Sequence, residues 1–251
     1  MIICTWPLGH FYFAQKGGMA MLNRYVGDRA FYRRVFAIAI PIIIQNGITN
    51  LVNLLDNIMV GQLSNAEISA VTIINNNLLF IMMLCLFGGA AGAGIFTTQF
   101  YGSEDQDGIR YTFRFKILIS LLITIIGAVI FIFGCDRLVG LYLQGDGDPV
   151  LAAETLRYSR TYMFIMLLGM LPFAITNAYS STLRECGHPT VPVVCSFIAV
   201  GVNLILNYVL IFGHFGAPAL GVTGAAIATV ISRFVECICV IVWTHLHTAE
   251  C

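Results

Sequence analysis

The sequence predicts an all-α membrane protein built as a bundle of six transmembrane helices. Of its 251 residues, 58% are hydrophobic and only 10% are charged, which is far more apolar than an ordinary soluble domain. Six apolar stretches each reach or exceed the length of about 20 residues that a helix needs to cross the hydrocarbon core. Short polar loops separate them, without the alternating segments of about ten residues that mark a membrane β-barrel, so we expect helices.

The length rule assigns the elements in order along the chain. The six predicted spans cover 35–60, 73–99, 115–134, 158–182, 191–213 and 219–243. Residues 1–20 precede them and lack a basic start, a sustained apolar core and a cleavage site of small residues, so they are not a convincing signal peptide. We interpret residues 1–20 as a non-native or misassigned extension and residues 21–251 as the membrane lobe.

Lysine and arginine residues predict the orientation of the spans. Nine lie in segments on one side: Lys16, Arg24, Arg29, Arg33, Arg34, Arg110, Arg114, Lys116 and Arg184. Three lie on the other: Arg137, Arg157 and Arg160. The positive-inside rule therefore predicts that both termini are cytoplasmic, as an even number of spans requires. With a formal net charge of zero and scattered basic residues, nothing in the chain favours nucleic acid as a partner.

The first span carries an unusual polar face. Its members are Gln45, Asn46, Thr49, Asn50, Asn53, Asp56 and Asn57. At about 100° per residue they fall within an arc of roughly 140°, while isoleucines and leucines fill the rest. Two interpretations stay open: amides commonly hold transmembrane helices together, or this face lines a polar cavity.

Asp56 requires a compensating group. An ionised carboxylate costs about 2.5–3.5 kcal/mol near the bilayer centre and less toward the interface. A proton, a bound cation or a basic partner would offset this cost. The basic residue well inside a span is Arg233, which has Glu236 one turn away as a local partner and lies toward the opposite side of the membrane.

The fifth and sixth spans supply polar groups at a matching depth. Asn203 and Asn207 share one helix face, one turn apart, and Thr229 lies in the sixth span. At 1.5 Å per residue, Asn207 is about 9 Å and the other two about 15 Å from the outer ends of their spans. Together with Asp56 they form a set of hard oxygen ligands suited to a small alkali cation or a proton and unsuited to a soft metal.

Two prolines and two glycines interrupt the apolar runs. Pro41 and Pro172 remove helix hydrogen bonds and predict either hinges or static kinks. Gly88 and Gly92 form a small-xxx-small pattern, which lets helices approach closely.

Four stretches resemble the multidrug and toxic compound extrusion (MATE) family. They are FAIAIPIIIQNGITNLVNLLDNIMVGQ at 36–62, TTQFYGSEDQDGIR at 97–110, LRECGHPTVP at 183–192 and NLILNYVLIFGHFGAPALGVTGAAIATVISR at 203–233. The resemblance implies one six-helix lobe of a twelve-helix antiporter that exports cationic or amphipathic drugs and xenobiotics in exchange for Na⁺ or H⁺. It also implies a cation site at Asp56, Asn203, Asn207 and Thr229, with no other cofactor.

The same resemblance sets the expected surroundings. A MATE protein lies in the cell (inner or plasma) membrane, among lipids, and binds small-molecule drugs. Here the chain stops where family members continue into a C-terminal lobe, so we expect the missing lobe to come from the same gene or from a separate chain.

Three alternatives stay open or are excluded on chemistry. A lipid-linked precursor flippase of a related fold would favour a strongly cationic cavity, for which Arg233 is the candidate. A non-transporting truncated fragment is the second alternative. A membrane-embedded enzyme would need paired carboxylates or a histidine constellation at membrane depth, which the spans lack, so we expect no enzyme.

Overall fold

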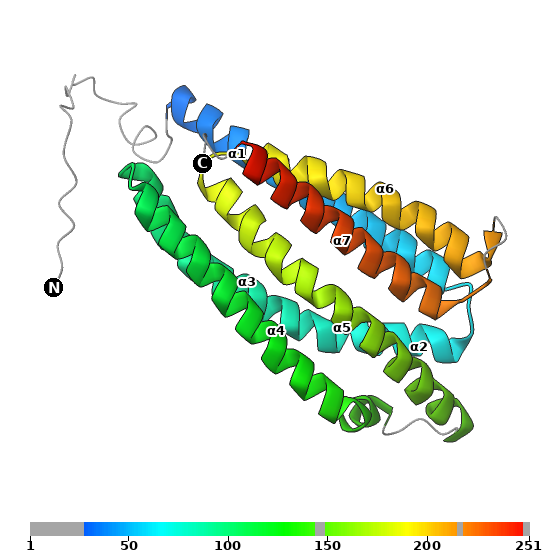
Figure 1. The fold of residues 1–251 in the computed structure, drawn as a ribbon. Helices are drawn as coiled ribbons and strands as arrows, with labels where there is room; N and C mark the ends of the chain where they lie inside the picture. Colours follow the sequence, from blue (N-terminus) through cyan, green and yellow to red (C-terminus); the bar gives the residue numbers. More distant parts are fainter. Residues whose placement is uncertain (1–27, 144–148, 215–217, 248–251) are drawn as a thin grey trace, which may run out of the picture. The chain divides into compact units, whose positions relative to one another are not determined.

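The computed structural model describes residues 28–143, 149–214 and 218–247, and within these ranges it contains helices and no strand (Figure 1). The helices are α1 (Arg29–Val60), α2 (Asn65–Ile73), η2 (Ile74–Leu79), α3 (Phe80–Gly102), α4 (Gln106–Leu143), α5 (Pro149–Glu185), α6 (Thr190–Phe212) and α7 (Val222–Leu246). Since α2, η2 and α3 run on without a break, six helices are long and apolar enough to cross a membrane. The predicted all-α membrane class is confirmed.

The helices agree with the predicted spans in place but not in length. Each predicted span lies within one helical stretch or passes its end by at most three residues. The largest difference is α4, whose 38 residues begin at Gln106, because polar residues up to Arg114 continue the helix beyond the apolar run. The predicted extension at 1–20 lies outside the described residues.

The chain divides into two compact units, residues 1–39 and 40–251. The boundary falls inside α1. In the first unit the rings of Tyr32 and Phe36, one turn apart, stack with centroids 6.3 Å apart. All contacts discussed below lie within the second unit.

The core of the second unit forms around α5, which packs against α2, α3, α4 and α7. Met163, Met166 and Met170 follow one face of α5 and are fully or almost fully buried, together with Ile74 and Leu86. Methionine fills irregular gaps because its side chain is unbranched and flexible. Close packing of this kind holds helices together in lipid, where water exclusion contributes little.

Glycines set the closest helix approaches. A Cβ atom on Gly224 of α7 would lie 2.5 Å from the backbone oxygen of Leu210 in α6, and one on Gly169 of α5 would lie 2.9 Å from Val230 Cγ2 in α7. The lack of a side chain therefore permits the α6–α7 and α5–α7 contacts. Gly88 and Gly92 have no atom within 4 Å of such a Cβ, so our interpretation of them as a packing motif is wrong for the described part of this chain.

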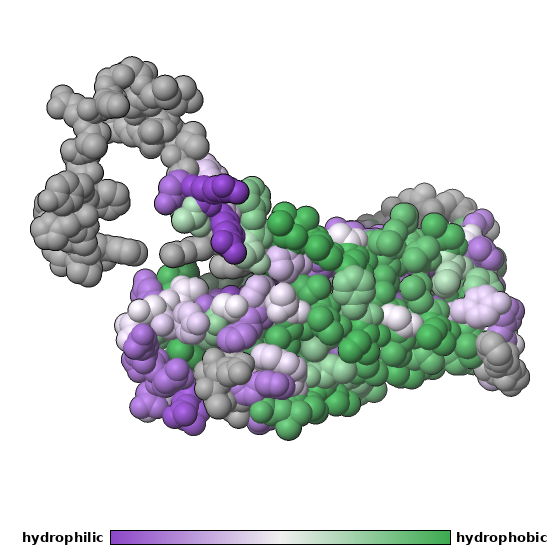
Figure 2. Space-filling view, turned by 90° about the horizontal axis from the view of Figure 1, so that it is seen from above, coloured by the Kyte–Doolittle hydropathy of each residue, from purple (hydrophilic) through white to green (hydrophobic). Residues whose placement is uncertain are grey.

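The outer surface is apolar. Figure 2 shows hydrophobic side chains across the middle of the face that it displays, with hydrophilic side chains gathered toward both ends. Large apolar side chains such as Phe133, which is 85% exposed, and Leu168, which is 64% exposed, project outward. Such continuous exposed apolar surface is typical of a protein that contacts lipid.

Local signals fix the ends of two helices. Ser64 and Glu67 form a capping box at the start of α2, in which each side chain bonds the backbone N–H of the other residue. Gly213 ends α6 in the left-handed conformation at φ 73°, which glycine adopts without a Cβ clash.

Between α2 and α3, η2 is a π-helical turn. This geometry is rare in proteins, and where it occurs it often lies at a functional site.

Candidate cation site

Asp56 lies one turn before the end of α1, and its partly buried carboxylate contacts α6. Its Oδ1 accepts a hydrogen bond of 2.5 Å from Asn207 Nδ2. Within the described residues, no lysine, arginine or histidine nitrogen lies within 4.0 Å of this carboxylate. The acid is therefore compensated by an amide dipole rather than by a basic partner.

Asn203 and Asn207 occupy the same face of α6, one turn apart, and both are almost completely buried. Asn207 Nδ2 donates to Asn203 Oδ1 at 3.1 Å as well as to Asp56. An amide nitrogen has two hydrogens, so this donor is fully used. Asn207 Oδ1 is buried and has no hydrogen-bond partner, which leaves an unsatisfied oxygen next to a carboxylate.

Thr229 lies on α7, near the middle of the first half of that helix. Its hydroxyl donates to the backbone oxygen of Ala225 at 3.0 Å, as threonines inside helices often do. The hydroxyl proton is used in this bond, so the oxygen lone pairs stay available to a cation or to a donor.

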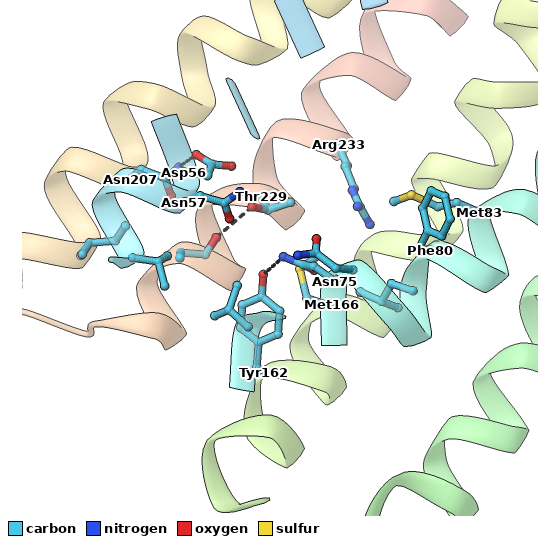
Figure 3. Close-up of a pocket in the computed structure, with 16 residues that line it drawn as sticks. Asp56, Asn57, Asn75, Phe80, Met83, Tyr162, Met166, Asn207, Thr229 and Arg233 are labelled. Carbon is cyan, nitrogen blue, oxygen red and sulfur yellow. Dashed lines mark hydrogen bonds between the residues drawn. The ribbon is translucent and has the colours of Figure 1, made fainter. Parts of the chain in front are cut away.

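Asp56, Asn207 and Thr229 line a cavity of about 210 Å³. Its polar lining comprises Asp56, Asn57, Asn75, Asn76, Tyr162, Asn207, Thr229 and Arg233. Figure 3 shows Asp56 and Asn207 on one side of the cavity and Arg233 on the other. The cavity is smaller than the about 300–1,000 Å³ of pockets that enclose a drug-sized ligand, but it has room for an ion and several waters.

A second donor pair lines the cavity from η2 and α5. Asn75 Nδ2 donates to the hydroxyl of Tyr162 at 2.8 Å, and the Tyr162 ring is almost completely buried. The π-helical turn carries the run Asn75, Asn76 and Asn77, and the first two of these line the cavity. The turn therefore contributes two consecutive amides to the lining of one cavity.

Comparison with known proteins places the chain in a family. A family model described as MatE matches residues 41–209, well over half of the chain. The chain belongs to the MATE family.

Several proteins are similar to this MATE chain. The "Probable multidrug resistance protein NorM" of Thermotoga maritima is 25% identical over 203 residues, which cover 81% of this chain and 42% of the relative. The protein of the same name from Bacillus licheniformis is 29% identical over 220 residues, covering 86% and 45%. The chain thus spans less than half the length of these relatives, which carry the names of resistance proteins and not of enzymes.

Solved structures share the fold. One, described as the "Outward-facing conformation of a multidrug resistance MATE family transporter of the MOP superfamily", superposes with a TM-score of 0.72 at 21% identity. The superposed part covers 86% of this chain and 45% of the chain in the solved structure. The arrangement of the six membrane helices is therefore that of one lobe of a twelve-helix MATE transporter.

The MATE chain brings together the four residues predicted to bind a cation, but only three of them line the cavity. Asp56, Asn207 and Thr229 line the cavity. Asn203 is not among the lining residues but contacts Asn207 from the next turn of α6. The arrangement thus has three oxygen-bearing side chains at the cavity and one behind them.

Apart from Asn57, which lines the cavity, the polar residues of α1 before Asp56 lie elsewhere or outside the described side chains. Thr49 donates to the backbone oxygen of Gln45 at 3.0 Å, and the Asn46 and Asn50 side chains are exposed. None of these four lines the cavity at Asp56, and the side chain of Asn53 lies outside the described part of the structure. Their predicted role at a transport cavity stays a prediction.

Gln45 belongs to a separate polar network among α1, α5, α6 and α7. Its Nε2 donates to Ser196 Oγ at 2.9 Å, and its Oε1 accepts from Arg184 Nη1 at 3.4 Å. Ser196 in turn donates to Glu236 Oε1 at 2.5 Å. Glu236 therefore bonds to Ser196. Its charge attracts that of Arg233, the partner expected from their spacing, but within the described residues no nitrogen–oxygen contact of 4.0 Å or less joins the two.

Another polar contact joins α4 to the end of α5. Lys116 is completely buried, forms an ion pair with Glu185, and also donates to Ser181 at 3.3 Å and Thr182 at 3.2 Å. Lys116, which we counted among the charges between two spans, lies inside α4, as Arg110 and Arg114 also do, and the predicted orientation stays a prediction. Pro41 and Pro172, the predicted hinges, lie inside α1 and α5, which both continue past them.

Sequence reasoning missed Asn75, Asn76 and Tyr162 as cavity residues. The run of three asparagines inside an apolar stretch was a usable signal, because amides are rare at membrane depth. Tyr162 carried no such signal, since a tyrosine within an apolar helix usually packs as an aromatic residue.

Proposed function

We propose that this chain is one lobe of an antiporter that exports cationic or amphipathic drugs and xenobiotics in exchange for Na⁺ or H⁺. The coupling cation is bound by Asp56, Asn207 and Thr229, with Asn203 orienting Asn207 from behind. One observation carries the proposal: a buried amide oxygen without a hydrogen-bond partner lies beside a carboxylate that has no basic partner among the described residues.

A bound cation would satisfy both the unpaired amide oxygen and the uncompensated carboxylate. It would accept the free lone pairs of Asn207 Oδ1, and it would balance the charge on Asp56, whose burial in a span costs about 2.5–3.5 kcal/mol near the bilayer centre. Carboxylate, amide and hydroxyl oxygens are hard ligands, which suits Na⁺. A proton on Asp56 would remove the charge in a different way and is the alternative coupling ion.

Coupling follows from the helices that supply the ligands. Asp56 belongs to α1, Asn207 to α6 and Thr229 to α7, so cation binding would link three helices. Inward movement of one cation releases about 2.3 kcal/mol per 100 mV of membrane potential. Loading and release would change the packing of these helices, with Pro41 and Pro172 as hinges.

The proposal also includes a second lobe and a location in the cell membrane. The relatives named NorM are called multidrug resistance proteins, and they are more than twice as long as the matched part of this chain. We expect a second lobe, from the same gene or a separate chain, to face the exposed Asn46 and Asn50 across a substrate path. The cell membrane, with both termini cytoplasmic, is the expected location.

The decisive experiment replaces Asp56 in the full-length protein. Proteoliposomes containing the wild type, Asp56→Asn or the control Asp136→Asn are loaded with a cationic fluorescent dye, and a Na⁺ or pH gradient is imposed. Asp136 is an exposed aspartate of α4 outside the cavity, so its variant should transport normally. Dye efflux driven by the gradient should disappear in Asp56→Asn; if it persists at the wild-type rate, the mechanism is wrong.

A second measurement separates binding from transport. Because a ligand that binds the folded state raises its melting temperature, Na⁺ added to a choline background should raise the melting temperature of the wild type and of Asp136→Asn but not of Asp56→Asn. A Na⁺-independent melting temperature combined with Asp56-dependent efflux would assign H⁺ as the coupling ion.

A further inference from the structure

Arg233 lines the cavity that also contains Asp56, and within the described residues it forms no ion-pair contact with a carboxylate. Its side chain projects from α7 into the cavity (Figure 3), and it is partly buried. Its guanidinium carbon lies 5.1 Å from the centre of the Phe173 ring, and Nη1 lies 3.3 Å from Met170 Sδ. Among the described residues, no carboxylate oxygen lies within 4.0 Å of it.

These contacts leave most of the hydrogen-bonding capacity of Arg233 unused. A guanidinium has five N–H donors in a planar fork and keeps its positive charge in proteins. A thioether is a weak acceptor, and an aromatic face accepts no conventional hydrogen bond. Glu236, the nearby acid on the same helix, attracts the guanidinium electrostatically but accepts its hydrogen bond from Ser196, so it leaves the guanidinium N–H donors free.

Neighbouring groups add further donors. The Tyr162 hydroxyl accepts from Asn75, so its own proton is left to donate, and no acceptor for it occurs among the described residues. The amide of Asn76 lines the same cavity. The side at Arg233 is therefore rich in donors, whereas the side at Asp56 and Asn207 Oδ1 is rich in acceptors.

We propose that Arg233, with the Tyr162 hydroxyl, forms a binding site for a monovalent anion in this cavity. The preferred ligand is a carboxylate attached to an aromatic or apolar body, because the guanidinium fork matches a carboxylate in a two-bond arrangement and because Phe80, Met83 and Met166 form apolar walls. A free halide such as chloride has the same charge and is the other possible source of the anion.

The anion site does not depend on cation coupling. The consequence for transport does rest on the proposed function: a MATE protein with this site would accept substrates that carry a carboxylate in addition to a cationic group. Asp56 and Arg233 would then bind opposite charges on the same molecule or on two separate ions.

The test uses the full-length protein in lipid nanodiscs, with benzoate and chloride as probes. Sodium sulfate forms the background, so that the Na⁺ concentration stays constant while benzoate or chloride replaces sulfate. Benzoate should raise the melting temperature of the wild type in a saturable manner. Arg233→Gln should weaken its apparent affinity at least about tenfold, since it removes a charge-assisted pair of hydrogen bonds.

Two further variants make the outcome interpretable. Arg233→Lys keeps the charge but loses the fork, so it should retain a response to chloride and lose most of the response to benzoate. If Arg233→Gln does not fold, the responses of Arg233→Lys to the two probes test the anion site instead. Asp56→Asn should bind benzoate at least as tightly as the wild type, because it removes a negative charge from the cavity, and this result is independent of whether Asp56 couples transport.

Each outcome decides a part of the proposal. A response of the wild type to chloride alone would support the anion site and overturn the carboxylate as its ligand. The anion site itself is overturned if neither probe affects the wild type, or if Arg233→Gln responds to both probes as the wild type does.

Discussion

The side-chain amide of Asn207 donates to the Asp56 carboxylate at 2.5 Å and thereby joins α6 to α1. Because the other amide hydrogen is donated to Asn203, the amide has a fixed orientation, with its oxygen left free. The same residue thus stabilises the carboxylate and offers an additional cation ligand.

Asn207→Leu should remove both contributions. The expected result is a loss of Na⁺ affinity of about 10- to 100-fold, because a hydrogen bond to a charged group contributes about 1.5–3 kcal/mol and each 1.4 kcal/mol changes affinity about tenfold. Titration calorimetry with Na⁺ measures the effect on the purified protein. Gln99→Leu, which changes an exposed amide on α3, is the control and should bind Na⁺ normally. Equal affinities for both variants would remove Asn207 from the site.

Lys116→Met should destabilise the fold strongly. It leaves the Glu185 carboxylate without its ion-pair partner, and breaking a buried pair from one side costs about 3–5 kcal/mol. The double variant Lys116→Met, Glu185→Leu removes both charges and should recover most of the lost stability. Denaturant unfolding in mixed micelles compares the two variants. If the double variant were as unstable as the single one, the ion pair would not be the cause.

Gly224→Ala should force α6 and α7 apart. The added Cβ would meet the Leu210 backbone oxygen, which cannot move aside as a side chain can, and overpacking typically costs about 1–3 kcal/mol. Gly88→Ala adds the same methyl group where no atom lies within 4 Å, and it should be neutral or slightly stabilising, because alanine favours helix. Thermal unfolding measures both, and a similar melting temperature for the two variants would contradict the packing argument.

Ser196→Ala should disconnect the network that joins Gln45 to Glu236. It leaves the Gln45 amide without its acceptor and Glu236 without its donor, and buried groups left in this state cost about 1–3 kcal/mol each. Ser120→Ala is a matched control, because Ser120 Oγ is buried and has no partner, so its removal should be neutral or stabilising. A smaller loss of stability for Ser196→Ala than for Ser120→Ala would show that the network does not stabilise the lobe.

The number and order of the helices could be predicted because the bilayer imposes a length and a hydropathy on each span. The ends of the helices could not. Residues 106–114 of α4 include four charged or amide side chains and are still helical, because a helix needs an apolar face only where it contacts lipid or the core.

The part of the candidate site that could be predicted is the assignment of its residues to helix faces, which follows from helical periodicity. Periodicity put Asp56 on the polar face of α1 and Asn203 with Asn207 on one face of α6, and the structure brings these faces into contact. It could not show which glycines lie between helices, since spacing says nothing about the neighbouring helix, and Gly224 rather than Gly88 makes the close contact. Nor could it find the bond from Asn75, which lies in the π-helical turn, to Tyr162, because periodicity within one helix does not show which side chain of another helix lies opposite.

That turn also affects how this chain should be compared with its relatives. A π-helical turn takes up one more residue than an α-helical turn, so it absorbs an insertion within Ile74–Leu79 while the residues before and after keep their facing. A relative with one residue fewer between these positions would have a regular helix and the same buried Leu86. For such a relative, the alignment gap therefore belongs inside the asparagine run. If the gap were placed within α3 instead, the residues between the turn and the gap would be assigned to the wrong helix face.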